Sequence, residues 1–199
     1  MIRVLDFLFS FFGIIILLPF FFIVGIIIKM SSTGPVFYVQ SRVGWNGVSF
    51  NVYKFRTMRI NSDNLGLITI GDRDPRITSF GYFLRKYKID ELPQLVNVFC
   101  GEMSFVGPRP EVKKYVDLYT LEQRKVLSIR PGITDWASIH YLDENFILGK
   151  SCDPEKDYIT KVLPDKLKYN MVFIDNYCVL EYLKIIFSTF RYIVVIRRK

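Results

Sequence analysis

The sequence has a single histidine, His140, and only three cysteines, Cys100, Cys152 and Cys178, among its 199 residues. The cysteines are odd in number and far apart, which argues against a disulfide framework or a zinc site and predicts reduced thiols in a chain facing the cytosol. One histidine, with no serine or acid singled out beside it, argues against a Ser-His-Asp triad. The motifs Gly-x-x-x-x-Gly-Lys-Ser/Thr, Gly-x-Gly-x-x-Gly and His-Glu-x-x-His are absent, so the phosphate loops and zinc helices that they build are not expected.

Acidic residues are also fewer than basic ones. There are 19 Asp and Glu against 27 Lys and Arg, which gives a net charge of +8 and predicts an acidic partner: nucleic acid, an anionic membrane or a phosphorylated substrate. Nucleic acid is the weakest of these, because no recognised motif accompanies the charge. A hydrophobic content of 50% excludes a disordered chain, and the length suits one compact domain.

Residues 7–28 contain no charge. As a helix this segment would cover about 33 Å, roughly the hydrocarbon thickness of a bilayer, and no small-x-small cleavage site precedes Lys29, so we expect an anchor and not a signal peptide. Pro19 lies in the middle and predicts either a kinked spanning helix or a re-entrant hairpin; the frequency of proline in ordinary transmembrane helices favours spanning. Basic residues that follow the segment predict that the rest of the chain is cytoplasmic: Lys29, Arg42, Lys54, Arg56 and Arg59.

The remaining chain predicts a mixed, mostly helical domain. Residues 36–39 and 48–53 are rich in β-formers around a Gly-Trp-Asn-Gly turn, which predicts a hairpin, and 61–79 are expected to form a polar loop. Hydrophobic spacing predicts helices over four segments: 79–87, 90–99, 112–127 and 165–177. No repeat or linker divides this region.

The segment 179–199 predicts an amphipathic helix with a basic end. Its apolar positions recur at helical spacing: Leu180, Leu183, Phe187, Phe190 and Val194. Such a helix can lie on an anionic membrane surface or pack on the protein's own core, and the sequence leaves both open.

Two adjacent carboxylates, Asp90 and Glu91, open the segment IDELPQLVNVF. The simplest interpretation is a helix cap, since Asp is a preferred N-cap and acids suit the first turn. A carboxylate at a helix N-terminus also stays ionised where a phosphate can bind. Asp90 is therefore a candidate nucleophile toward phosphorus, with Glu91 holding a divalent cation.

Basic residues flank this segment on both sides. Arg85 and Lys86 precede it, and Arg109 follows it between two prolines that fix the local backbone, an arrangement suited to two-pronged phosphate recognition. A competing site is the triplet Asp72-Arg73-Asp74, because Asp-x-Asp holds the metal in many nucleotide-sugar glycosyltransferases. The pattern is short, however, and Asp74-Pro75 is also an ordinary turn opener.

Taken in order, a set of motifs resembles the bacterial sugar transferases, small monotopic phosphoglycosyl transferases that begin polysaccharide and glycan assembly. The motifs are KFRTM (54–58), DPRIT (74–78), Gly81, LRK (84–86), IDELPQLVNV (89–98), Gly101, MSFVGPRPE (103–111) and RPGIT (130–134). The resemblance covers nearly the whole chain. It departs at residues 135–140, where many members read Gly-Trp-Ala-Gln-Val-Asn, and the chain resembles the minimal catalytic form without extra N-terminal transmembrane helices.

The resemblance implies transfer of a sugar-1-phosphate from a UDP-sugar to a polyprenyl phosphate such as undecaprenyl phosphate, with release of UMP. It implies Mg2+ as cofactor, held by Asp90 and Glu91, with Asp90 as the covalent nucleophile and Lys54, Arg85 and Arg109 as substrate-binding residues. It also implies that the Pro-broken segment is re-entrant, in place of the spanning helix favoured above. The sugar is not identified by the sequence.

We therefore expect an α+β, mostly helical monotopic membrane protein on the cytoplasmic face of the bacterial inner membrane. Its parts are a re-entrant anchor (1–30) and a catalytic domain (31–199) with a small β-hairpin and surface amphipathic helices, the last of them interfacial, as one folding unit. A homodimer is compatible with this expectation. The alternatives are a metal-dependent glycosyltransferase that uses Asp72 and Asp74 and releases UDP, and a non-enzymatic membrane-surface adaptor.

Overall fold

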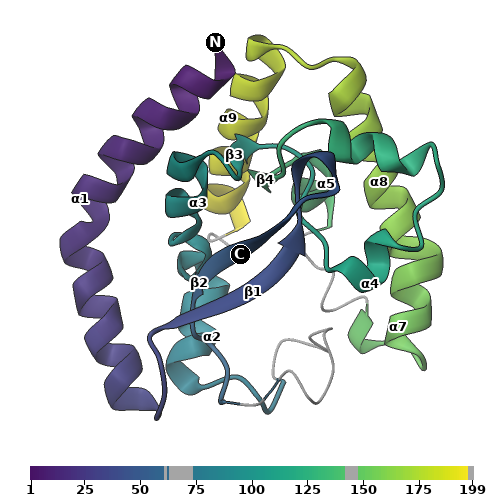
Figure 1. Cartoon of the computed structure of the whole chain (residues 1–199). Helices are drawn as coiled ribbons and strands as arrows, with labels where there is room; N and C mark the ends of the chain where they lie inside the picture. The colour runs from purple at the N-terminus through teal and green to yellow at the C-terminus, as the bar shows by residue number, and fades with distance from the viewer. Residues whose placement is uncertain (61, 63–73, 142–147, 197–199) are drawn as a thin grey trace.

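The computed structural model describes residues 1–60, 62, 74–141 and 148–196. The helices and strands in these ranges are α1 (Ile2–Ser31), β1 (Phe37–Val43), β2 (Ser49–Phe55), α2 (Ser79–Lys86), α3 (Gln94–Cys100), β3 (Ser104–Val106), α4 (Lys113–Val116), β4 (Gly132–Thr134), α5 (Trp136–His140), α7 (Pro154–Asp157), α8 (Leu163–Asp175) and α9 (Val179–Ile196). The described part of the protein is mostly helical and contains a β-hairpin, as predicted, together with a second small sheet that was not predicted (Figure 1).

The long apolar segment forms α1, which continues through Pro19 as one helix. Figure 1 shows this purple helix bowed along one side of the molecule, with its convex side turned away from the rest of the chain. Proline removes one helical hydrogen bond, so a bend is the expected consequence, and the predicted break is a bend within a continuous helix. Among the described residues, α1 is the one helix long and apolar enough to cross a membrane.

Both halves of α1 pack against the rest of the chain. In the first half, Phe7 stacks on Phe99 of α3 with 5.1 Å between ring centroids. In the second half, Ile28 is buried in a cluster with Phe55 and Leu84. The outer side of the helix stays exposed and apolar, with large side chains that include Phe9, Phe12, Ile16, Leu18 and Phe22.

Strands β1 and β2 form the predicted hairpin, with Phe37 opposite Phe55 and Val43 opposite Ser49. Both strands are longer than the β-rich stretches suggested. The turn requires positive φ angles at Asn46 (53°) and Gly47 (76°), which asparagine and glycine tolerate best.

Helix α3 is attached to the free edge of β2 through Asn97, which is fully buried. Its Oδ1 accepts from the backbone N–H of Tyr53 at 3.1 Å, and its Nδ2 donates to Asn51 O at 2.7 Å and to Glu102 Oε2 at 2.7 Å. The side-chain amide therefore replaces the peptide group of a neighbouring strand. This attachment places the turn before α3 beside β2.

Strands β3 and β4 pair in parallel, with Ser104 opposite Gly132 and Val106 opposite Thr134. The backbones cross closely just after β3, because a Cβ atom built on Gly107 would lie 2.3 Å from Arg130 O. Glycine is required there for steric reasons.

Among the other predicted helices, 79–87 and 165–177 are confirmed by α2 and α8. The continuous helix over 112–127 is wrong: α4 ends at Val116 and a separate 3-10 turn covers Gln123–Ser128. Thr120 starts this turn, since its Oγ1 accepts from Gln123 N and its own N–H donates to Gln123 Oε1. Most of the predicted loop 61–79 lies outside the described residues.

Helix α9 packs on the core through Tyr182 and Ile185, both fully buried. Its predicted apolar stripe faces outward instead: Leu180, Leu183, Phe187 and Phe190 are exposed. Packing on the protein's own core is thus confirmed for one side of this helix, while contact of its exposed apolar side with a membrane stays a prediction.

Candidate active site

Asp90 and Glu91 lie in a single 3-10 turn, Ile89–Glu91, which precedes α3. The interpretation of Asp90 as the N-cap of α3 is wrong, because Pro93 occupies that position and Lys88 precedes the turn. Lys88 has a φ of 56°, a left-handed conformation that is unfavourable for lysine and separates the turn from α2. Both carboxylates are buried, with exposures of 8% and 9%.

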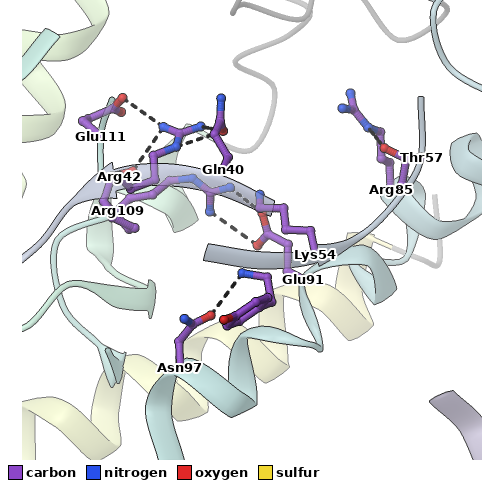
Figure 2. A network of polar contacts seen from close by, with 11 residues as sticks. Gln40, Arg42, Lys54, Thr57, Arg85, Glu91, Asn97, Arg109 and Glu111 are labelled. Carbon is purple, nitrogen blue, oxygen red and sulfur yellow. Dashed lines mark hydrogen bonds and ion pairs between the residues drawn. The ribbon is translucent and has the colours of Figure 1, made fainter. Parts of the chain in front are cut away.

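Glu91 is held between two cations (Figure 2). Lys54 Nζ on β2 donates to Glu91 Oε1 at 2.8 Å, and the guanidinium of Arg109, from the loop after β3, donates to both carboxylate oxygens. Burial alone would raise the pKa of Glu91, but Arg109 and Lys54 outweigh it and hold that pKa well below its usual range. Burial lowers the pKa of Lys54, and Glu91 offsets part of this change.

Asp90 has different surroundings. Its Oδ1 is buried and has no hydrogen-bond partner among the residues that the structure describes. Burial and the neighbouring charge of Glu91 raise the pKa of Asp90, while Lys54, Lys88 and Arg85 act in the opposite direction. The turn therefore carries two different carboxylates. Glu91 is bound by cations, whereas Asp90 has a buried oxygen without a hydrogen-bond partner in the described part of the chain.

Arg85, at the end of α2, approaches the same turn. Its Nε donates to Thr57 Oγ1 at 2.9 Å (Figure 2). Burial lowers the pKa of Arg85, and the nearby charge of Asp90 partly offsets this. Of the predicted residues, Lys54 and Arg109 thus contact Glu91 from two different elements, whereas Arg85 contacts Thr57 and is near enough to Asp90 for the two charges to affect each other's pKa.

Of the competing triplet, Asp72 lies outside the described residues. The carboxylate of Asp74 accepts from Nε and Nη2 of Arg76, at 2.9 and 2.6 Å, and Asp74 Oδ1 also accepts from Arg76 N. These contacts are those of a turn closed by an ion pair, in agreement with the turn-opener interpretation.

Sequence reasoning did not identify a second group of polar residues beside Arg109, formed by Gln40, Arg42 and Glu111 (Figure 2). Arg42 donates to Gln40 Oε1 through Nε and Nη2, at 3.0 and 2.6 Å, and through Nη1 to Pro110 O at 3.2 Å. The end of β1 is also joined to this loop by Val43 N donating to Glu111 O at 2.8 Å. The sequence did contain a sign of this group: Gln40 and Arg42 are two positions apart on β1, so their side chains lie on the same face of the strand.

No group of three or more His, Cys, Asp or Glu side chains that could hold a metal ion occurs in the described part of the chain. Mg2+ is commonly held by one or two carboxylates together with substrate phosphates, and the Asp90 oxygen that has no partner within the described ranges suits that arrangement. The prediction that Glu91 is also a ligand stays a prediction; its oxygens here accept from Lys54 and Arg109.

Chemically, the turn combines a buried carboxylate oxygen of Asp90 with two cations bound to Glu91, Lys54 and Arg109, and with Arg85 nearby. Guanidinium and ammonium groups bind phosphate oxygens, and a carboxylate oriented toward a phosphorus atom that they hold can attack it. The site thus has the parts needed for transfer of a phosphorylated group.

Comparison with known proteins gives the same indication. The family described as bacterial sugar transferase matches residues 1–196. The chain is 34% identical over 194 residues to a UDP-N-acetylgalactosamine-undecaprenyl-phosphate N-acetylgalactosaminephosphotransferase of Aeromonas hydrophila, covering 95% of this chain and 42% of that protein. It is 32% identical over 183 residues to the UDP-glucose:undecaprenyl-phosphate glucose-1-phosphate transferase of Escherichia coli, covering 88% and 36%. It is 34% identical over 203 residues to the exopolysaccharide production protein ExoY of Sinorhizobium fredii, covering 94% and 82%.

The chain spans less than half the length of the Aeromonas and Escherichia proteins, and most of the Sinorhizobium one. The family match, in contrast, extends over nearly every residue and includes the turn with Asp90 and Glu91 and the loop with Arg109. The chain belongs to the bacterial sugar transferase family.

Proposed function

We propose that this protein transfers a sugar-1-phosphate from a UDP-sugar to undecaprenyl phosphate or a similar polyprenyl phosphate, and releases UMP. The observation that carries the proposal is the buried Oδ1 of Asp90, which has no hydrogen-bond partner among the described residues. Lys54 and Arg85 are near enough to act on its charge, and Arg109 is bound to the adjacent Glu91. The names of the Aeromonas and Escherichia relatives describe transfers of this kind to undecaprenyl phosphate.

The reaction proceeds in two displacements at one phosphorus atom. A carboxylate oxygen of Asp90 attacks the sugar-bearing phosphorus of the donor, the bond to the bridging oxygen breaks, and UMP leaves with the electron pair. A phosphate oxygen of the polyprenyl phosphate then attacks the same phosphorus. The bond to Asp90 breaks, which regenerates the carboxylate and gives a polyprenyl-diphosphate sugar.

The cations bind the diphosphate and offset the charge that develops on the leaving UMP. Glu91 holds Lys54 and Arg109 toward one point, because it accepts from both. Mg2+ held by Asp90 and the diphosphate would supply further charge neutralisation. These roles separate the two carboxylates: Asp90 reacts, and Glu91 orients cations.

We propose that α1 is a re-entrant membrane anchor and that the domain lies on the cytoplasmic face of the bacterial inner membrane. Support comes from the two ends of α1, since Arg3 near one end and Ile28 near the other both contact the same domain. A straight spanning helix would carry one end across the bilayer, away from these contacts. The exposed apolar side of α1 and the open side of α9 then face lipid.

Side-specific labelling tests this topology. The three native cysteines are exposed and are first replaced by serine, and Ile2→Cys introduces one reporter. In intact cells a membrane-impermeant thiol reagent should not reach the reporter, and lysis should expose it. Labelling from outside would mean a spanning helix. Pro19→Ala should straighten α1 and shift some molecules toward external labelling.

The function is tested by offering the purified protein a panel of UDP-sugars with undecaprenyl phosphate and Mg2+. We expect UMP as the nucleotide product with at least one donor. UDP in place of UMP would mean that the sugar alone is transferred, and would contradict the proposal. No nucleotide release with any donor would leave the adaptor alternative.

Asp72→Asn separates the two enzymatic hypotheses. Under phosphoglycosyl transfer the variant should keep most of its turnover, whereas a glycosyltransferase with Asp72 and Asp74 on its metal should lose it. Initial rates at saturating Mg2+ provide the measurement. Inactivity of a well-folded Asp72→Asn protein would favour the alternative.

Arg109→Lys should be damaging although the charge is kept. Lysine cannot make the two-pronged contact of a guanidinium with a carboxylate or phosphate. Because a hydrogen bond to a charged group contributes about 1.5–3 kcal/mol, kcat/KM should fall by roughly 10- to 100-fold. The exposed Arg124→Lys is the matched control and should have no effect. Equal kinetics for both variants would place Arg109 outside the site.

A further inference from the structure

A carboxylate lies in α1, the most apolar of the long helices that the structure describes. Asp6, in the second turn of α1, is 1% exposed, and its Oδ1 accepts three hydrogen bonds. The donors are Ser104 Oγ at 3.0 Å, Phe105 N at 3.0 Å and Tyr182 OH at 2.8 Å. Burying a charge is costly unless hydrogen bonds compensate it, so a carboxylate with three donors is a specifically built contact.

One turn earlier, Arg3 makes a second polar contact between α1 and the domain. Its Nη1 donates to Val98 O at 2.6 Å and its Nη2 to Phe99 O at 2.8 Å. These are carbonyls at the C-terminal end of α3, where a cation is favourable. Gly101 fits closely beside it, since a Cβ atom there would lie 3.1 Å from Arg3 Nη2.

The contacts of Arg3 and Asp6 are made with the two elements that lie next to the site residues in the sequence, α3 and β3. Helix α3, which Arg3 holds at its far end, follows directly after the Asp90–Glu91 turn. Strand β3, which Asp6 holds at its middle residue, leads within four residues to Arg109. The first two turns of α1 thus hold both α3 and β3, the elements next to the site. Asp6 also binds α9, because it accepts a hydrogen bond from Tyr182. In Figure 1 the N-terminal turn of α1 lies beside α9.

We propose that Asp6 is a positioning residue for the transfer reaction: it fixes β3, and through β3 the loop that presents Arg109 to Glu91 and the diphosphate. The anchor is in this sense part of the active-site scaffold as well as a membrane attachment. The inference rests on the function proposed above for Arg109.

The test compares UMP release by Asp6→Ala, Asp6→Asn and Ser10→Ala in detergent, at equal concentrations of folded protein. A misplacement of about 1 Å can cost roughly 100-fold in rate, so Asp6→Ala should lower kcat/KM by roughly 10- to 100-fold. Asp6→Asn should retain activity within about threefold, because the three donors reach one oxygen that an amide also provides. Ser10 is fully buried one turn later, but its Oγ donates only to Asp6 O and Phe7 O of α1 itself, so Ser10→Ala should match the unaltered enzyme.

A double-mutant cycle then asks whether Asp6 acts through Arg109. In an Arg109→Lys background, Asp6→Ala should lower kcat/KM by less than about a further threefold, because the contact it positions is already lost. If Asp6→Ala does not fold, Tyr182→Phe removes one donor and enters the same cycle. Effects that multiply, or full activity of Asp6→Ala, would overturn this inference alone. Absence of UMP release by the unaltered enzyme would overturn the proposed function and this inference with it.

Discussion

Asp90→Asn should abolish sugar-phosphate transfer while leaving the protein folded. An amide cannot act as the anionic nucleophile, so turnover should fall by at least about 10⁴-fold, as when other nucleophiles are removed. Intact-mass measurement after mixing with donor should show a phospho-sugar adduct on the unaltered enzyme and none on the variant. Substantial activity in a well-folded Asp90→Asn protein would contradict the covalent role.

The same variant should be more stable than the parent at neutral pH. Burial raises the pKa of Asp90 in the folded state, so folding favours the protonated form, and stability falls as pH rises from the ordinary carboxyl range through the raised pKa. Asparagine has no such charge. The difference in melting temperature between variant and parent should therefore widen as pH rises above about 4, the ordinary pKa of Asp. A parent that remains the more stable protein throughout would mean that the charge of Asp90 is compensated in the fold.

Glu91→Gln should damage both stability and rate. The glutamine leaves Lys54 and Arg109 facing each other without their shared anion, and breaking a buried ion pair costs about 3–5 kcal/mol. Because Arg109 is 32% exposed at its side chain, we expect a loss near 3 kcal/mol, the lower end of that range. Turnover should fall by roughly 100-fold, since both cations lose their orientation.

The Mg2+ dependence of the Glu91→Gln variant shows whether Glu91 binds only Lys54 and Arg109 or also the metal ion. If Glu91 only orients the cations, the Mg2+ concentration for half-maximal rate should stay close to that of the parent, whereas a marked rise would make Glu91 a metal ligand. Asp117→Asn is the control, because it breaks an exposed ion pair with Lys113 that contributes about 0–1 kcal/mol. Unchanged rate and stability in Glu91→Gln would reduce Glu91 to a simple first-turn acid.

The parts of the fold that depend on local pattern were predictable. The hairpin follows from β-rich residues around a turn with Asn46 and Gly47, and α2 from hydrophobic spacing after Thr78, whose Oγ1 accepts from Gly81 N at 2.9 Å. The predicted helix over 112–127 failed because Thr120 starts a new turn, a local competition that spacing alone does not reveal. Similarly, the left-handed Lys88 gives Asp90 a turn of its own where the sequence suggested a cap.

In the candidate site, the residue types were predictable but their partners were not. Arg109 stands out in sequence because two prolines enclose it, and Lys54 through its motif, yet nothing in sequence joins them to the same oxygen of Glu91. That meeting depends on the attachment of α3 to β2 by Asn97 and on the contacts of Arg42 with the loop. Such long-range contacts arise from tertiary packing, which short motifs do not encode.

The contact between Asp6 and Tyr182 joins residues 176 positions apart. At a synthesis rate of roughly 5–20 residues per second, about 9–35 s separate their appearance on the ribosome. Throughout that interval α1 has its apolar surface exposed and Asp6 lacks Tyr182 as a donor. Docking of α1 onto α9 is accordingly among the last steps of folding. If α1 is the membrane anchor proposed above, it would enter the membrane before the domain that holds both of its ends is complete, with Asp6 kept near water and away from the bilayer centre.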